Sequence, residues 1–171
     1  MKIIDLLEES YNDLTDDKKI YLLQQNGNNI SSMDEPSEEL QRIAVQQSGY
    51  AIKWIISKGI EPSPEVKELA VQQNGWAIQY INNPSYKLQR LAVQRHGWTI
   101  ELIIDKQIKP SYEIIKIVLT HPDVILGDDD IDSSKHSYDD LVKRLLPTSS
   151  LLVNKWIRYG DRIRGRINEN N

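Results

Sequence analysis

"AVQQNGWAIQYINNPS", residues 70–85, decides the fold: Gly75 separates a polar QQN from an aromatic WAI. Nearly the same words occur four times, each centred on a glycine. The copies read YLLQQNGNNI at Gly27, IAVQQSGYAI at Gly49, LAVQQNGWAI at Gly75 and LAVQRHGWTI at Gly97. Self-similarity at a regular spacing is the signature of a repeat architecture.

Proline–serine pairs mark the ends of the repeats, with the prolines at Pro36, Pro62, Pro84 and Pro110. From proline to the next glycine is 13 residues in three copies, and from glycine to the next proline is alternately 9 and 13. The four-residue difference is close to one helical turn of about 3.6 residues. The repeats therefore measure 22 or 26 residues.

This spacing predicts a pair of helices in each repeat. A serine after each proline is placed to cap a helix start (Ser37, Ser63, Ser85 and Ser111). Pro64 suits a first helical turn, and the glycine is expected to end the first helix in the left-handed conformation. The second helix, WAIQYI in the third copy, is apolar almost all round, so it needs neighbouring repeats to cover it.

The outer copies depart from the pattern, as terminal repeats do. Asn28 stands where other copies have Tyr or Trp, and Asp123 replaces the glycine in KIVLTHPDVIL. We predict an all-α fold: a right-handed α-solenoid of about five short helix pairs with a small helical C-terminal element. Residues 1–13 form an N-terminal cap, 14–126 the repeats, 127–136 an acidic linker and 137–171 a helical, basic element.

Composition narrows the class of protein. The 171 residues suffice for one core, and the absence of cysteine excludes disulfides, thiolate metal sites and a cysteine nucleophile. The N-terminal apolar stretch is too short for a signal peptide, and no apolar run approaches the roughly 20 residues that span a bilayer. We expect a cytoplasmic protein that does not bind a membrane.

The net charge of −4 is unevenly distributed. Residues 1–40 carry −7 and residues 127–140 carry −5, whereas residues 41–126 carry +3 and residues 141–171 carry +5. Each end of the chain therefore has its own electrostatic character, which bears on its partners.

The phrase A-V-x-Q-x-G-[YW]-A-I-x-x-I between proline–serine markers resembles a family of tandem short helical repeats of unknown function. That family occurs in phage, giant-virus and intracellular-bacterial proteins. The resemblance covers residues 36–108 well and the flanking copies loosely. It implies a viral or mobile-element origin and brings no catalytic residue or cofactor.

Two columns of residues are candidate binding features. Gln24, Gln46, Gln72 and Gln94 lie three residues before each glycine, and Arg42, Glu68 and Arg90 lie one turn earlier. The glutamines either satisfy carbonyls at helix ends or form a ligand-facing ridge, in which Arg42, Gln46, Gln72, Arg90 and Gln94 are the candidate residues. The aromatic column of Tyr50, Trp76 and Trp98, continued by Trp54 and Tyr80, is expected to pack between repeats.

The C-terminal stretch LLVNKWIRYGDRIRGRI forms a candidate basic stripe with Lys155, Arg158, Arg162, Arg164 and Arg166. Gly160 and Gly165 weaken a continuous helix there. The stripe either packs internally, for example against Asp128–Asp132, or contacts phosphates or an acidic protein.

The sequence offers no positive sign of an enzyme. Segment 127–140 has alternate aspartates but Ser133 and Asp139 where a calcium loop needs glycine and glutamate, so we read it as a linker before a helix capped by Ser137. His96, His121 and His136 lack partners at metal or triad spacing. We predict no catalytic residues, no metal and no cofactor.

The predicted function is therefore protein binding, by a phage or mobile-element accessory protein that modulates or inhibits a host protein. The acidic N-terminal region favours a basic partner, for example a nucleic-acid-binding protein. Two alternatives stay open: nucleic-acid binding through the basic stripe, and a homo-oligomeric structural protein bridged by Trp156 and the tail.

Overall fold

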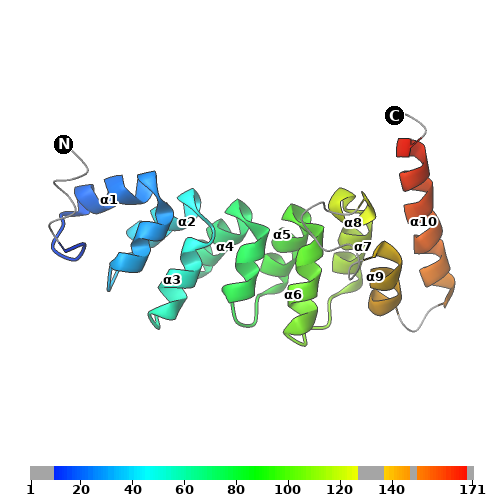
Figure 1. The fold of residues 1–171 in the computed structure, drawn as a ribbon. Coiled ribbons are helices and arrows are strands. Elements are labelled where there is room, and N and C mark those ends of the chain that lie inside the picture. The colour runs from blue at the N-terminus through cyan, green and yellow to red at the C-terminus, as the bar shows by residue number, and fades with distance from the viewer. Residues whose placement is uncertain (1–9, 127–136, 147–149, 169–171) are drawn as a thin grey trace. The chain divides into compact units, whose positions relative to one another are not determined.

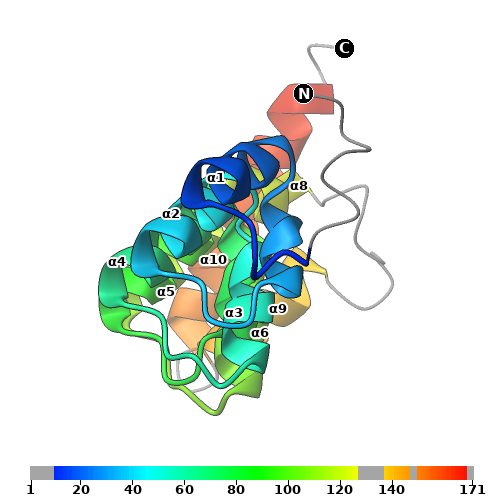
Figure 2. The same ribbon diagram turned by 90° about the vertical axis from the view of Figure 1, so that its left-hand side faces the viewer.

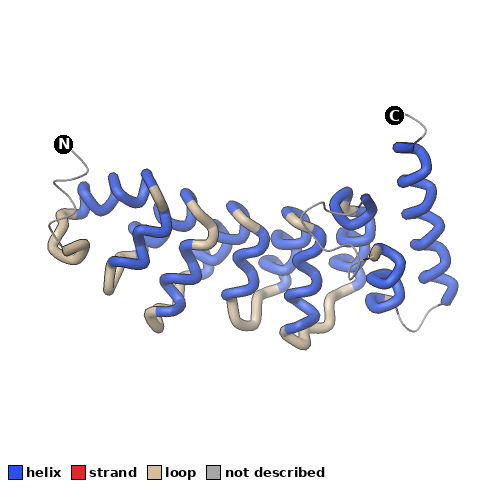
Figure 3. Tube along the Cα trace, in the orientation of Figure 1, coloured by secondary structure: helices blue, strands red, loops and turns tan. Residues whose placement is uncertain are grey.

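The computed structural model describes residues 10–126, 137–146 and 150–168 of the chain. These residues form helices and no strand, so the predicted all-α class is confirmed (Figure 3). The chain divides into two compact units, residues 1–95 and 96–171. The predicted acidic linker, 127–136, lies outside the described residues.

The first unit is built from two layers of elements. One layer holds α1 (Asp16–Gln25), α2 (Glu38–Gln47), α4 (Pro64–Gln73) and α5 (Tyr86–Arg95), and the other holds η2 (Gly27–Ser32), α3 (Ala51–Ser57) and η3 (Gly75–Tyr80). In the first layer α1 packs on α2, α2 on α4 and α4 on α5 (Figures 1 and 2). In the second layer α3 packs against both η2 and η3. The layers bury the apolar stripes that the sequence predicts, including Val66, Ala70 and Val71 of α4.

The second unit contains η4 (Gly97–Thr99), α6 (Ile100–Asp105), α7 (Tyr112–Thr120), α8 (Pro122–Leu126), α9 (Tyr138–Leu145) and α10 (Ser150–Asn168). Here α8 packs against η4, α7 and α10, and α9 packs against α7 and α10. Tyr138 lies buried among them and donates its hydroxyl toward the carbonyls of Leu119 and Trp156, at 3.2 and 3.1 Å. The helix α10 runs unbroken through Gly160, where a Cβ would lie 2.5 Å from the Tyr138 ring. This glycine therefore serves the packing of Tyr138 and does not interrupt the helix.

The predicted serine caps are confirmed. Each of Ser37, Ser63, Ser85 and Ser111 accepts a hydrogen bond from the backbone N–H three residues later, at 3.3–3.4 Å. Pro64 opens α4, where its missing donor costs nothing.

The second element of a repeat differs with repeat length. In the 22-residue repeats it is a six-residue 3₁₀ helix, η2 or η3, where a full α-helix was expected. The side chains of Asn26 and Asn74 each accept from the N–H two residues on, at 3.0 Å, which starts these tight turns. In the 26-residue repeats the element is an α-helix followed by a residue of positive φ, Gly59 at 75° or Gln107 at 60°.

The prediction that the repeat glycines take the left-handed conformation is wrong. Among the described glycines only Gly59 has a positive φ. The repeat glycines serve close approach, because a Cβ at Gly27 would lie 2.2 Å from the carbonyl oxygen of Ala44, and one at Gly49 2.5 Å from that of Ala70. No side chain fits in that space.

The same glycines bind the repeat that follows through a hydrogen bond. The Gly27 N–H donates to Oε1 of Gln47, and the Gly49 N–H donates to Oε1 of Gln73, each at 2.6 Å. We call this pairing the glycine–glutamine contact. It explains why the phrase A-V-Q-Q-x-G recurs: the alanine and the second glutamine of one repeat both meet the glycine of the repeat before.

Candidate binding surfaces

The glutamine column lies on the outer surface of the first helices. Gln24, Gln46, Gln72 and Gln94 are all exposed. Within the described part of the chain, the side chains of Gln46 and Gln72 make no hydrogen bond. The structural role weighed for them belongs to the next residue along, Gln47 or Gln73, a role that sequence reasoning missed.

The arginines of the candidate ridge have different surroundings. Arg42 is half-buried and reaches Glu38 of its own helix at 3.8 Å and Glu65 of α4 at 4.0 Å, so it helps to join neighbouring repeats. Arg90, on α5, is exposed. The ion pairs of Arg42, whose carboxylate partners are exposed, are of the surface kind that contributes about 0–1 kcal/mol each. The ridge thus combines charges that link repeats with exposed amides.

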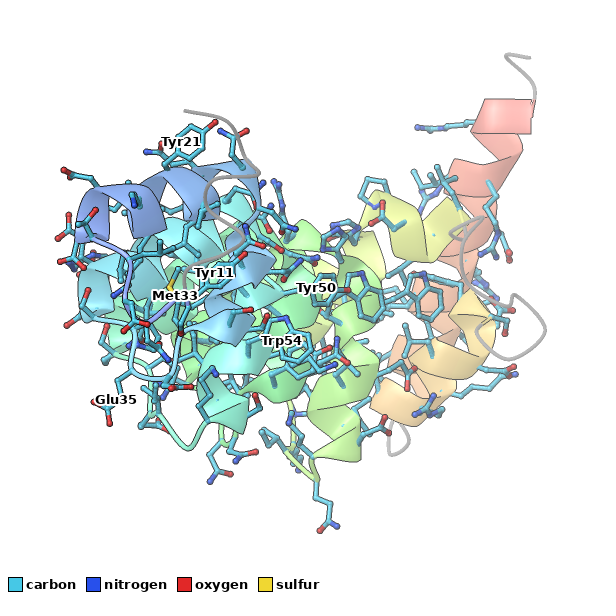
Figure 4. The ribbon with its side chains drawn as sticks, turned by 60° about the vertical axis from the view of Figure 1, so that its left-hand side comes forward. Tyr11, Tyr21, Met33, Glu35, Tyr50 and Trp54 are labelled. Carbon is cyan, nitrogen blue, oxygen red and sulfur yellow. The ribbon has the colours of Figure 1, made fainter. Side chains whose placement is uncertain are left out.

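The aromatic column is only partly buried, which corrects the expectation that it packs between repeats. Trp98 is 2% exposed and its indole N–H donates to the carbonyl of Asp123 at 3.1 Å, as a core residue would. Trp76 and Tyr80 are half-buried. Tyr50 and Trp54 are 39% and 36% exposed (Figure 4).

The exposed rings, the half-buried Tyr80 and one lysine form a cluster. The rings of Tyr50 and Tyr80 meet edge to face with centroids 6.2 Å apart, and Lys53 Nζ lies 4.9 Å from the centroid of Trp54 and 6.0 Å from that of Tyr80. We call these four residues the aromatic–lysine cluster. Lys53 and Trp54 belong to α3, Tyr50 directly precedes it and Tyr80 ends η3; the two elements are packed together in the first unit.

The neighbouring repeat carries small polar residues where the cluster has its rings. In η2, Asn28 and Ser32 occupy the positions that correspond to Tyr50 and Trp54. Both side chains are exposed, whereas Ile30 of the same element is fully buried. In the sequence alone, Asn28 indicates only that its repeat is a terminal one.

The residues of the candidate basic stripe do not all face the same side of α10. Lys155, Arg158, Arg162 and Arg166 are exposed on α10. Arg164 instead turns toward α9: its guanidinium lies 5.3 Å from the Tyr138 ring and within 3.5 Å of Asp139, and it pairs with Asp161 at 2.6 Å. Arg164 is therefore part of the internal packing of the second unit.

The described residues hold no group of three or more His, Cys, Asp or Glu side chains that could bind a metal. His121 lies beside Asp123, with Nδ1 3.5 Å from the carboxylate, and the predicted Ser137 cap of α9 is present. Most of the calcium-like segment falls outside the described residues. No described helix is both long and apolar enough to span a membrane.

Comparison with known proteins adds no assignment. No protein-family model matches the chain, and neither the curated proteins nor the solved structures include a similar one.

Proposed function

We propose that the repeats form a right-handed α-solenoid that acts as a non-enzymatic protein-binding module. The packing of α1 on α2, α2 on α4 and α4 on α5 supports this arrangement, as do the glycine–glutamine contacts between successive repeats. A stacked scaffold presents a preformed surface, so little conformational entropy is lost when a partner binds.

The aromatic–lysine cluster is the observation that carries the proposal. Large exposed rings cost free energy in water, since burying one stabilises by roughly 1.5–3 kcal/mol. Trp and Tyr are also the residues that most often dominate binding energy at protein interfaces. Tyr50 precedes and Trp54 lies on the short helix α3, whose buried side, with Ala51, Ile52 and Ile55, is fixed in the core. The rings are therefore held ready for a partner.

The negative charge of the N-terminal part of the first unit favours a basic protein as that partner. Residues 1–40 carry a net charge of −7. The first turns of α1 and α2 expose Asp16, Asp17, Glu38 and Glu39. Such a surface attracts a basic protein and repels the phosphates of nucleic acid. A nucleic-acid-binding host protein has the required charge.

The origin and setting of the chain belong to the same proposal. The repeat phrase resembles a family of phage, giant-virus and intracellular-bacterial proteins, and this resemblance suggests an accessory protein acting in the host cytoplasm. Its effect would be to modulate or inhibit the host protein that it binds.

The test is affinity capture from host lysate, with and without nuclease treatment, using two matched variants. Tyr50→Asn/Trp54→Ser installs the residues that the first repeat already carries at these positions, and Gln46→Ala/Gln72→Ala alters the exposed glutamines. We expect a nuclease-resistant protein that the aromatic variant loses and the glutamine variant keeps. Loss with the glutamine variant alone would move the site to the ridge, and recovery only through nucleic acid would contradict the proposal.

Light scattering tests the homo-oligomer alternative. The proposed module is expected to be a monomer with a measured mass of 19.8 kDa. A larger mass that Trp156→Ala returns to that of the monomer would favour a structural assembly.

A further inference from the structure

The second unit contains a groove between α7 and α10 that the proposed protein-binding surface does not use. It has a volume of about 320 Å³. Tyr112, Lys116 and Thr120 line it from α7, where they are spaced four residues apart and so share one face. Lys155, Trp156, Tyr159 and Arg162 line it from α10. The volume is at the lower end of the roughly 300–1,000 Å³ typical of small-molecule sites.

The groove concentrates positive charge. Lys116, Lys155 and Arg162 are exposed, and within the described part of the chain none of the three forms an ion pair. Other basic residues of the unit are engaged: Arg144 pairs with Glu101 at 2.8 Å, and Arg164 with Asp161 at 2.6 Å. Among the residues that the structure describes, no acidic side chain lines the groove. Three cations from two helices around one hollow favour an anion.

The groove also carries aromatic rings beside these cations. Trp156 and Tyr159 meet edge to face with centroids 5.6 Å apart, and both are half-buried, which limits their movement. The backbone carbonyl of Trp156 lies 3.1 Å from the buried Tyr138 hydroxyl, which holds this turn of α10 in place. Across the groove Tyr112 is 51% exposed. Flat rings next to cations are the arrangement on which unstacked bases bind.

We propose that this groove binds a nucleotide, with the phosphate held by Lys116, Lys155 and Arg162 and the base stacked on Trp156, Tyr159 or Tyr112. The nucleotide comes either free in solution or as a unit of single-stranded nucleic acid. A duplex keeps its bases stacked inside the helix, so it cannot place one in a hollow of this size. The site differs from the basic stripe foreseen in the sequence, because it needs Lys116 and Tyr112 of α7 and does not use Arg164.

Fluorescence anisotropy on the full chain distinguishes the two sources. A labelled single-stranded octamer is titrated with protein, and AMP, UMP, inorganic phosphate and unlabelled duplex serve as competitors. Unlabelled single-stranded oligonucleotide and mononucleotides are expected to compete with the labelled octamer. If nucleic acid is the natural ligand, the oligonucleotide should bind more tightly than the mononucleotides. If a free nucleotide is the natural ligand, the oligonucleotide should bind no more tightly than they do. Competition by inorganic phosphate at the same concentration as AMP, or by duplex as well as by single strand, would overturn the proposal.

Salt dependence and one matched pair of variants test the contacts. Three phosphate contacts on a single strand predict a log–log slope of affinity against salt of about −2. Lys116→Gln is expected to lower affinity about fivefold at 0.1 M salt and to reduce the slope by roughly 0.7. The control is Lys143→Gln, which removes the same charge from an exposed lysine of α9. Equal effects of the two variants would show general electrostatic attraction and contradict a site in the groove.

The tryptophan indole N–H signals in an NMR spectrum give a readout that is independent of charge. The chain has four tryptophans, and the Trp156 signal is assigned with Trp156→Phe. AMP is expected to shift the Trp156 signal and leave that of Trp54 unchanged. A shift of Trp54 alone would place the nucleotide on the aromatic–lysine cluster and refute the groove. The Trp54 signal also separates this test from that of the protein-binding surface.

Discussion

Gly49→Ala is the most informative single substitution, because the structure specifies what the added methyl group would meet. Its Cβ would lie 2.5 Å from the carbonyl oxygen of Ala70, 2.8 Å from Oε1 of Gln73 and 2.9 Å from Cβ of Asn74. Two of these atoms belong to the backbone or are attached directly to it, so α4 must move away from α3. The movement also lengthens the 2.6 Å hydrogen bond from the Gly49 N–H to Gln73.

The expected loss of stability follows from those two effects. Overpacking in a well-packed site costs about 1–3 kcal/mol, and a weakened hydrogen bond to a part-buried amide costs about 1 kcal/mol more. We therefore expect Gly49→Ala to lower the free energy of unfolding by roughly 2–4 kcal/mol. The matched control is Gly165→Ala, at a helical glycine whose added Cβ would meet nothing within 4 Å. This control should stabilise α10 by about 0.5–1 kcal/mol.

The assay is urea unfolding followed by circular dichroism, with Gln73→Ala and the double variant completing a cycle. Because Gly49 and Gln73 share one hydrogen bond, the double variant should lose less stability than the sum of the losses of the two single variants. Neutral behaviour of Gly49→Ala, or strict additivity with Gln73→Ala, would refute the reasoning about close approach.

Two further predictions concern Tyr138 and the residues of positive φ. Burial, partly offset by Arg164, raises the pKa of Tyr138 well above its usual value of about 10. The stabilising contribution of the protonated Tyr138 side chain is therefore complete below about pH 10 and is lost above it. Tyr138→Phe is expected to lower the free energy of unfolding by roughly 1 kcal/mol at about pH 9. Measured by urea unfolding, this difference should shrink as the pH rises from about 9 to 11. Gly59→Ala should cost about 1 kcal/mol in thermal unfolding although nothing lies within 4 Å, whereas Gln107→Gly, at the corresponding position, should be neutral or stabilising; equal effects would contradict the backbone argument.

Features that depend on neighbouring residues in the chain could be predicted from the sequence. The caps at Ser37, Ser63, Ser85 and Ser111 are confirmed because a serine before a helical run needs only the N–H three residues later. The all-α class follows from the same local periodicity.

Features that depend on contacts between repeats could not be predicted as readily. A glycine at the end of a helix suits either a left-handed cap or close approach, and only the contacts with Ala44 and Ala70 decide between them. The sequence does contain a sign of close approach, since an alanine and a second glutamine recur before the glycine.

The exposed surfaces show the same limitation. Tyr50 and Trp54 are exposed, although the second helix of a repeat is apolar almost all round in the sequence, a pattern that predicts burial. The direction of Arg164 could have been found from the sequence, because 3.6 residues per turn places it on the opposite side of α10 from Lys155 and Arg162. The groove with α7 could not, since it joins residues more than thirty positions apart.

Amide hydrogen exchange at Gly27 and Gly49 tests most directly the central claim, that the second and third repeats each hold the one before through a glutamine side chain. Both N–H groups bond to a glutamine side chain of the following repeat and not to a helix of their own. Both should be protected in the wild-type chain, and Gln73→Ala should speed exchange at Gly49 while leaving Gly27 protected. Fast exchange at both glycines in the wild type, or protection of Gly49 that survives Gln73→Ala, would contradict the account.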